Sequence, residues 1–183
     1  MTANFKTSFS KTLGEEGGYS NDPNDAGGET FCGISRVFNP NWIGWKRVDE
    51  IKAHGEFPKA DDTLLMIYVQ DFYRANIWDK IRGDAIQSQR IADVFFDTAT
   101  NFSVVTAIRM VQDCLDLLVK DMTVDGKIGT QTITTLNQLG ELEDDFIELL
   151  ISRRHAHRWN SFKKQPANKA FMKGWILNRD NGL

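Results

Sequence analysis

The sequence predicts a mainly α-helical protein, and three features of its 183 residues lead to this fold class. Apolar residues recur at steps of three and four along most of the chain, which is the spacing of one helix face. Alternating apolar and polar runs, which would indicate strands, are scarce. Gly and acidic residues gather in residues 13–35, which have almost no apolar periodicity, so we expect a loop there with a small hairpin at most.

The first predicted helix leads directly into this acidic loop. Phe5, Phe9 and Leu13 share one helix face. Gly17-Gly18 is expected to end the helix, because Gly tolerates the left-handed conformation of a C-terminal cap. This arrangement places Glu16 in the last helical turn, at the entrance to the loop.

Further helices follow, separated by turn residues and by residues that cap helix starts. We expect them over 45–54, from a cap at Asp61 or Asp62 to Trp78, from Ser88 to Phe102, over 104–118, from a cap at Thr130, over 141–158, and near 171–176.

The helix after Gly140 has acidic residues first and arginines last, the order that the helix dipole favours. Its predicted apolar side consists of Leu142, Phe146, Leu149 and Ile151. The arginines interpreted as stabilising its other end are Arg153, Arg154 and Arg158.

Glu16 and Asp25 form the candidate catalytic pair of the loop. The partial negative charge of a helix C-terminus disfavours ionisation of Glu16, which lets this carboxyl keep its proton and act as a general acid. Asp25 follows nine residues later and could be the second, ionised carboxylate. Two carboxylates in unlike environments are the equipment of glycoside hydrolysis.

The alternative interpretation is a solvated acidic turn or a calcium loop. The acids do not fall at the alternating positions of an EF-hand loop, and no Cys and His residues show zinc spacing. We therefore expect no metal and no cofactor.

Three residues outside the loop are candidates for lining a sugar cleft. Arg74 and Trp78 could contact substrate, although an ion pair with Asp71 or Asp79 and packing of the indole ring are the structural alternatives. Asp97 lies inside a mostly apolar helix, where an acid needs either a partner or a cleft.

Charge and cysteine usage restrict the class of protein. Residues 151–183 hold eight of the 22 Lys and Arg residues but only one of the 25 acids. This basic segment could attract an anionic polymer, or it could fold back and neutralise the acidic remainder of the chain. No apolar run could span a membrane, and the N-terminus lacks the pattern of a signal peptide. Cys32 and Cys114 are expected to be reduced structural thiols, with one disulfide as the alternative.

Motifs along nearly the whole chain carry a family resemblance. In order they are E-G-G-Y (16–19), N-D-P-N-D-A-G-G-E-T (21–30), G-I-S (33–35), Y-R-A-N-I-W (73–78), I-A-D-V-F-F-D-T-A-T-N (91–101), V-D-G-K-I-G-T-Q-T (124–132) and G-W-I-L-N-R (174–179). They resemble glycoside hydrolase family 108, N-acetylmuramidases that cut peptidoglycan and occur among phage endolysins and bacterial relatives. Ala26 stands where the family often has Pro.

The resemblance implies a lysozyme-like helical fold in which Glu16 of the E-G-G-Y motif is catalytic. Glu16, Asp25 and Thr30 are also similar to the Glu, Asp and Thr of phage T4-type lysozymes, with Thr30 one residue closer. Substrate-binding residues are predicted at Tyr19, Arg74, Trp78, Asp97 and Asn101.

We expect residues 1–95 to form the catalytic region and 96–183 a peptidoglycan-binding-like region packed on it. The predicted partner is the peptidoglycan glycan strand, with no nucleic acid. The predicted protein is a monomer that is made in the cytoplasm and acts in the periplasm or at the cell wall. A lytic transglycosylase is the alternative enzyme. A non-catalytic wall-binding or secretion-associated protein is the other alternative, which the intact E-G-G-Y motif disfavours.

Overall fold

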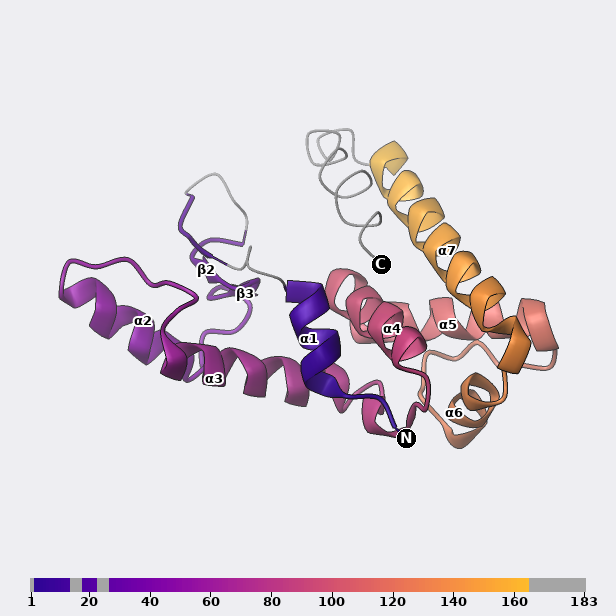
Figure 1. Cartoon of the computed structure of the whole chain (residues 1–183). Helices are drawn as coiled ribbons and strands as arrows, with labels where there is room; N and C mark the ends of the chain where they lie inside the picture. The colour runs from indigo at the N-terminus through magenta and orange to yellow at the C-terminus, as the bar shows by residue number, and fades with distance from the viewer. Residues whose placement is uncertain (1, 14–17, 23–26, 165–183) are drawn as a thin grey trace. The chain divides into compact units, whose positions relative to one another are not determined.

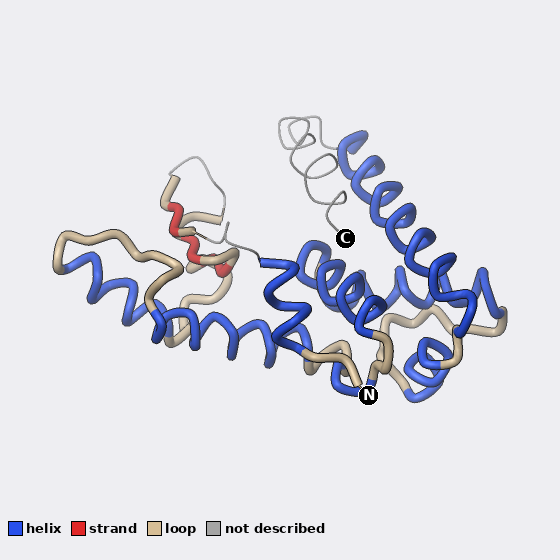
Figure 2. The backbone as a smooth tube through the Cα atoms, in the orientation of Figure 1, coloured by secondary structure: helices blue, strands red, loops and turns tan. Residues whose placement is uncertain are grey.

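Helices dominate the structure, a computed structural model that describes residues 2–13, 18–22 and 27–164 (Figure 1, Figure 2). The mainly α-helical fold class is thereby confirmed. Glu16, Asp25 and the last helix expected near 171–176 lie outside the described residues.

Most of the described helices begin and end close to the predicted bounds, but α7 ends at Lys164 and not near Arg158. The α-helices of the described residues are α1 (Phe5–Leu13), α2 (Gly44–Ala53), α3 (Thr63–Tyr73), α4 (Gln89–Phe102), α5 (Val104–Val119), α6 (Thr130–Asn137) and α7 (Glu143–Lys164). Shorter helical turns are the π-helical η1 (Arg74–Trp78) and the 3-10 turns η2 (Gly83–Ala85) and η3 (Gly140–Leu142).

Side-chain caps explain where two of these helices begin. Asp62 accepts a hydrogen bond from the backbone N–H of Leu65 at 2.8 Å, and Ser88 caps α4 in the same way. Each cap satisfies an N–H group that has no partner within the first helical turn. The predicted cap of α6 is wrong by one residue: Gly129 is the cap, and Thr130 is the first helical residue.

The acidic loop contains a three-stranded antiparallel sheet, one strand more than a hairpin. β1 (Tyr19–Ser20) pairs with β2 (Thr30–Phe31), and β2 pairs with β3 (Ile34–Ser35). Cys32 and Gly33 join β2 to β3 with φ angles of 45° and 76°, two positive values of the kind that a two-residue type I′ turn requires. A Cys at the first of these positions is not a usual turn signal, so the third strand was not predicted.

The chain divides into two compact units. The first consists of Met1–Ser8 and Ile77–Leu183, and the second of Phe9–Asn76. This division follows the packing of the backbone, whereas the division expected after residue 95 concerns function and stays a prediction. Among the described helices, none has the length and apolar character that a membrane crossing needs.

The core of the first unit forms around α4, α5 and α7. An aromatic cluster of Phe5, Trp78 and Phe96 packs edge to face, with ring centroids 5.7 to 5.9 Å apart. The buried carboxylate of Asp93 accepts hydrogen bonds from Ser8 and Gln89, each at 2.6 Å. These bonds offset the cost of burying an acid among apolar side chains.

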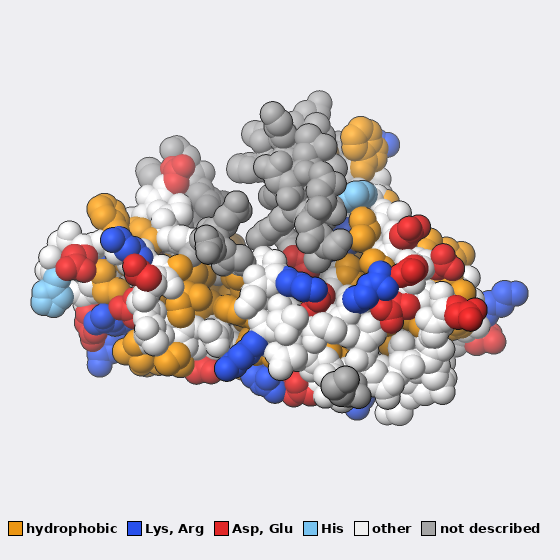
Figure 3. All heavy atoms as spheres, in the orientation of Figure 1, with side chains coloured by type: hydrophobic (Ala, Val, Ile, Leu, Met, Phe, Trp, Pro, Cys, Tyr) orange, Lys and Arg blue, Asp and Glu red, His pale blue; other side chains and the backbone are white. Residues whose placement is uncertain are grey.

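The first turn of α7 carries the predicted acids, where negative charge suits the helix dipole. Arg90 of α4 pairs with Glu143 at 3.4 Å and with Asp144 at 2.7 Å. Figure 3 shows acidic and basic side chains close together on the visible face of this unit.

The inward face of α7 differs from the predicted one. Its buried residues are Phe146, Leu150, Arg154, Arg158 and Phe162. Leu142 precedes the helix and is 36% exposed, and Leu149 and Ile151 are only half-buried. The prediction failed because Arg154 and Arg158 were assigned to a helix end, whereas α7 continues past them and buries both side chains.

The core of the second unit is aromatic. Trp42 stacks on Phe31 with centroids 6.4 Å apart and meets Trp45 and Phe72 edge to face. The indole N–H of Trp45 donates to the carbonyl oxygen of Asn39 at 2.7 Å. Both tryptophans therefore pack within their own unit, which accounts for them without a sugar ligand.

Candidate functional site

The two residues of the predicted catalytic pair lie in segments of the sequence between described helices and strands. Glu16 belongs to the segment between α1 and β1, and Asp25 to the segment between β1 and β2. Both residues lie outside the described residues. The separation of their carboxyl groups, about 6.5–9.5 Å for an inverting pair, stays a prediction.

Thr30, the third predicted catalytic residue, is half-buried in β2 opposite Ser20 of β1. Its hydroxyl donates a hydrogen bond to the carbonyl oxygen of Gly28 at 3.1 Å. This bond ties Thr30 to Gly28, in the described end of the β1–β2 connection.

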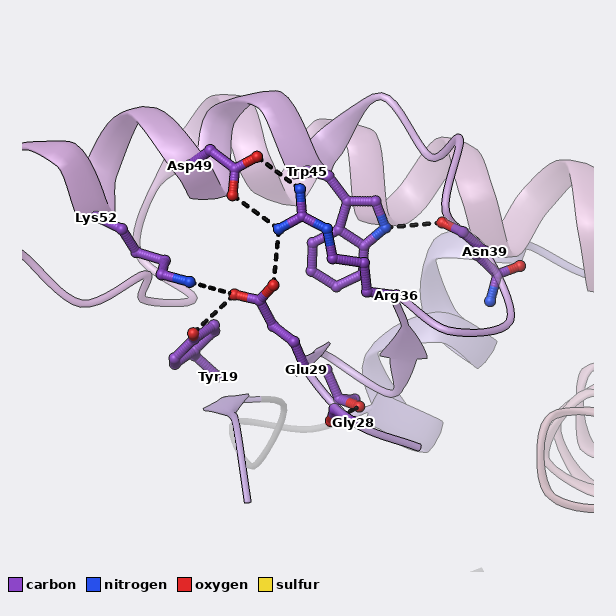
Figure 4. A network of polar contacts seen from close by, with 9 residues as sticks. Tyr19, Gly28, Glu29, Arg36, Asn39, Trp45, Asp49 and Lys52 are labelled. Carbon is purple, nitrogen blue, oxygen red and sulfur yellow. Dashed lines mark hydrogen bonds and ion pairs between the residues drawn. The ribbon is translucent and has the colours of Figure 1, made fainter. Parts of the chain in front are cut away.

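Glu29 lies at the centre of a polar network in the second unit (Figure 4). Its Oε1 accepts hydrogen bonds from the hydroxyl of Tyr19 at 2.7 Å and from the ammonium of Lys52 at 2.6 Å. Its Oε2 accepts one from the guanidinium of Arg36 at 2.7 Å. Arg36 also forms a bidentate pair with Asp49 of α2, at 2.7 and 2.6 Å. The network therefore joins β1, the end of the β1–β2 connection and α2.

These contacts decide the charge of Glu29. Burial acts to raise the pKa of Glu29, but the hydrogen bonds from Lys52, Arg36 and Tyr19 outweigh it and leave the pKa below its ordinary value. Burial, and next the hydrogen bond to Glu29, raise the pKa of Tyr19, so this hydroxyl stays protonated. Glu29 is therefore ionised near neutral pH and is unsuited to be a general acid.

We expect Glu29→Gln to make stability less dependent on pH. Because the folded-state pKa of Glu29 is depressed, its charge contributes stability above the unfolded-state pKa of about 4.3, and this contribution is lost as pH falls through the lower folded-state pKa. The variant should be less stable than wild type at neutral pH and should lose less stability on acidification. Urea unfolding followed by tryptophan fluorescence at several pH values measures both.

The control for this prediction is Glu56→Gln, which removes an exposed carboxylate of the same unit. It should leave the pH dependence of stability as in wild type. Equal pH dependence in wild type and Glu29→Gln would show that the network does not stabilise the ionised form.

Arg74 and Trp78 both belong to η1, but their side chains lie in different surroundings. Arg74 is exposed, and its contact with substrate stays a prediction. Trp78 is 0% exposed, and its indole N–H donates to Asp84 at 2.7 Å. A Cβ atom added at Gly83 would lie 2.3 Å from the indole ring, so the backbone packs directly against it. Core packing therefore accounts for Trp78.

Asp97 has the partner that an acid inside an apolar helix needs. Its carboxylate pairs with Arg154 of α7 at 2.5 Å, and the two residues are 4% and 0% exposed. Asn101 is half-buried and donates to the Asp97 carboxylate at 3.1 Å. This buried cluster joins α4 to α7, which gives Asp97 a structural role.

The thiols and the acids of the described residues show no metal-binding arrangement. No group of three or more His, Cys, Asp or Glu residues in the described part of the chain could hold a metal ion. Cys32 and Cys114 are buried and form no disulfide. Burial raises their pKa values to about 11 and about 12, so both are protonated thiols near neutral pH.

Sequence reasoning did not identify Glu29 as the centre of a network. Its partners come from three separate stretches of chain, and no local spacing connects them. One signal was present: Asp49 and Lys52 lie one turn apart on one face of the helix expected over 45–54. A helix face with one acid and one base can pair with a base and an acid of a neighbouring loop, as Asp49 does with Arg36 and Lys52 with Glu29.

Comparison with known proteins gives two family matches and a structural one. The family described as Glycosyl hydrolase 108 matches residues 9–102, and the family described as Predicted Peptidoglycan domain matches residues 106–180. The solved structure of Brucella abortus SagA covers 97% of this chain and 90% of its own, with a TM-score of 0.66 and 24% sequence identity. It therefore shares the fold. A search of curated proteins found no match.

Proposed function

The chain belongs to glycosyl hydrolase family 108, and from this membership we propose that it hydrolyses the β-1,4 bond between N-acetylmuramic acid and N-acetylglucosamine. The family matches by themselves show that the chain is a glycoside hydrolase and that peptidoglycan is its substrate class. The proposal for the cleaved bond rests on the intact E-G-G-Y motif at 16–19, which lies inside the matched residues 9–102.

In this proposal Glu16 protonates the leaving oxygen, and Asp25 activates a water molecule with help from Thr30. An acid and a base that act on opposite faces of the sugar give an inverting hydrolysis. The geometry of Glu29 supports the choice of Glu16, because an ionised and ion-paired carboxylate does not compete for the role of proton donor.

Substrate contacts are proposed for Tyr19, Arg74 and Asn101, which are half-buried or exposed and lie within the first family match. We assign residues 1–95 to catalysis and 96–183 to peptidoglycan binding. The positive charge of residues 151–183 suits an anionic polymer. We propose a monomer that acts in the periplasm or at the cell wall.

Asp25→Asn is expected to impair hydrolysis more than Asp22→Asn, by at least about tenfold, because general base catalysis is worth about 10²–10⁴-fold. Asp22 is the matched control, an exposed carboxylate on the same β1–β2 connection. Release of soluble fragments from purified peptidoglycan measures both variants. Equal and small losses would leave Glu16 as the sole acid, which suits a transglycosylase.

The identity of the cleaved bond is tested by reducing the digestion products with borohydride. The proposal predicts that muramic acid becomes the reduced terminal sugar. Reduced glucosamine would place the cut at the neighbouring bond. A wild type that produces neither new reducing ends nor anhydromuramic ends would support the non-catalytic alternative.

A further inference from the structure

The side chain of Phe57 is 74% exposed, more than any other large apolar side chain in the described part of the chain. One exposed apolar residue on its own needs no explanation. Phe57 has an aromatic neighbour, however, because its ring lies beside that of Tyr19, with centroids 6.4 Å apart and planes inclined by 53°. We call Tyr19 and Phe57 the aromatic pair; both belong to the second unit, and Tyr19 is half-buried.

The backbone on both sides of Phe57 is fixed by the fold. α2 ends in a Schellman motif, in which the N–H groups of Gly55 and Glu56 donate to carbonyl oxygens of the last helical turn at 2.9 and 3.2 Å. Gly55 has the positive φ that this motif requires, 78°. Pro58 follows Phe57 and is buried. Phe57 therefore lies between a capped helix end and a buried proline, which together hold its side chain outside the core.

Lys52 of the same helix end holds Tyr19 in place (Figure 4). Its ammonium lies 5.6 Å from the centroid of the Tyr19 ring, within range of a cation–π contact, and donates to Glu29 at 2.6 Å. The hydroxyl of Tyr19 donates to Glu29 at 2.7 Å. Because this hydroxyl already has a partner in the protein, the part of Tyr19 that a ligand can contact is the surface of its ring.

The aromatic pair suits a sugar by its chemistry. In a β-1,4-linked strand of N-acetylglucosamine and N-acetylmuramic acid, the large ring substituents are equatorial, so C–H groups project from both faces of each pyranose. Such C–H groups pack well against an aromatic ring, whose face is the negative side of its quadrupole. The cation beside the aromatic pair, Lys52, is already paired with Glu29. These contacts favour the uncharged sugar rings over the carboxylates of the peptide stems.

We propose that the aromatic pair binds a sugar ring of the glycan strand, with Phe57 stacked on the pyranose and the ring of Tyr19 beside it. This inference rests on the proposed function, which makes the glycan strand the substrate; both residues lie within the match to residues 9–102. Because the two planes are inclined by 53°, one flat sugar ring lies parallel to only one of them. Phe57 takes this place because it is the more exposed of the two.

Phe57→Ala should weaken the binding of peptide-free glycan strands about tenfold, because stacking and apolar burial are both lost with the ring. Electrophoresis through gels that contain such strands measures the dissociation constant, with Glu16→Gln present in every variant to keep the strands intact. In the otherwise wild-type chain, KM for the same strands should rise about tenfold while kcat changes by less than about threefold.

Two further substitutions separate stacking from general apolar contact. Phe57→Tyr keeps the ring and should bind within about twofold of the unchanged residue, whereas Phe57→Leu keeps only apolar surface and should bind at least about fivefold more weakly. Because Phe57 is exposed, all three variants should melt at the temperature of the wild type. Binding by Phe57→Leu as tight as by Phe57→Tyr would overturn the stacking contact.

Phe38→Ala is the matched control, because Phe38 is 73% exposed in the same unit and makes no ring contact within the described residues. Its affinity for the strands should stay within about twofold of wild type. An equal loss in Phe38→Ala and Phe57→Ala would show a general effect of apolar surface and overturn the inference. Unchanged affinity in Phe57→Ala would overturn it as well, and so would a loss confined to strands that still carry peptide stems.

Turnover and binding together separate this inference from the function on which it rests. If the wild type releases muramic acid ends and Phe57→Ala has the KM and the affinity of wild type, the sugar contact is wrong and the proposed function stands. If the wild type cleaves no strand but Phe57→Ala still binds strands more weakly, the proposed hydrolysis is wrong and the sugar contact stands.

Discussion

Glu16→Gln is expected to lower peptidoglycan hydrolysis at least about a hundredfold, because general acid catalysis is worth about 10²–10⁴-fold. The substitution keeps the shape of the side chain and removes the proton donor. Thermal stability should change little. Loss of turbidity of a cell-wall suspension, together with a melting curve of the same preparation, measures both quantities.

Glu15→Gln is the control for this substitution, since it makes the same chemical change one residue earlier. Its activity should stay within a few-fold of wild type, because Glu15 precedes the E-G-G-Y motif. A large loss in Glu15→Gln beside near-normal lysis by Glu16→Gln would exchange the roles of the two residues.

Arg154→Met is expected to lower the free energy of unfolding by about 3–5 kcal/mol, the usual cost of removing one partner of a buried ion pair. Arg154 and Asp97 are 0% and 4% exposed, and their contact at 2.5 Å joins α7 to α4. The substitution would leave the Asp97 carboxylate buried without its cation. Urea unfolding measures the loss.

The neighbouring Arg153 provides the control for this prediction. It pairs with Asp113 at 3.0 Å, but the two side chains are 41% and 35% exposed, and a pair of this kind contributes about 0–1 kcal/mol. Arg153→Met should therefore cost about 1 kcal/mol or less. Equal losses in the two variants would contradict a special role for the buried pair.

The Arg154 pair also bears on how the two family matches relate to each other. α4 lies within the match to residues 9–102, and α7 within the match to 106–180. The two helices share the core of the first unit. The family boundary therefore passes through one packed core, so a change in α7 is expected to destabilise α4 as well.

Local signals in the sequence predicted most of the helices. Asp62 and Ser88 cap α3 and α4 as expected, because a cap depends on residues only three positions apart. The third strand depends on positive φ angles at Cys32 and Gly33, and a Cys does not signal this conformation. Arg154 looked like a charge at a helix end, because its partner Asp97 lies 57 residues away.

The candidate site was also predicted only as far as local motifs reach. Motif resemblance identified Glu16, Asp25 and Thr30. The role of Glu29 depends instead on two cations that folding brings to it, Arg36 just after β3 and Lys52 of α2. Trp78 looked like a sugar-binding residue from its place in a motif, whereas its burial follows from packing against Phe5 and Phe96. Long-range contacts, which spacing along a sequence does not report, decide both cases.

Digestion of purified peptidoglycan in water labelled with heavy oxygen tests the central claim most directly. Hydrolysis transfers an oxygen from water to the new reducing end, so mass spectrometry should find one heavy oxygen on terminal N-acetylmuramic acid. A lytic transglycosylase forms an internal acetal at that carbon, with the sugar's own 6-hydroxyl displacing the leaving oxygen, and takes up no oxygen from water. Unlabelled anhydromuramic ends would therefore contradict hydrolysis, and labelled muramic acid ends would support hydrolysis of the bond between N-acetylmuramic acid and N-acetylglucosamine.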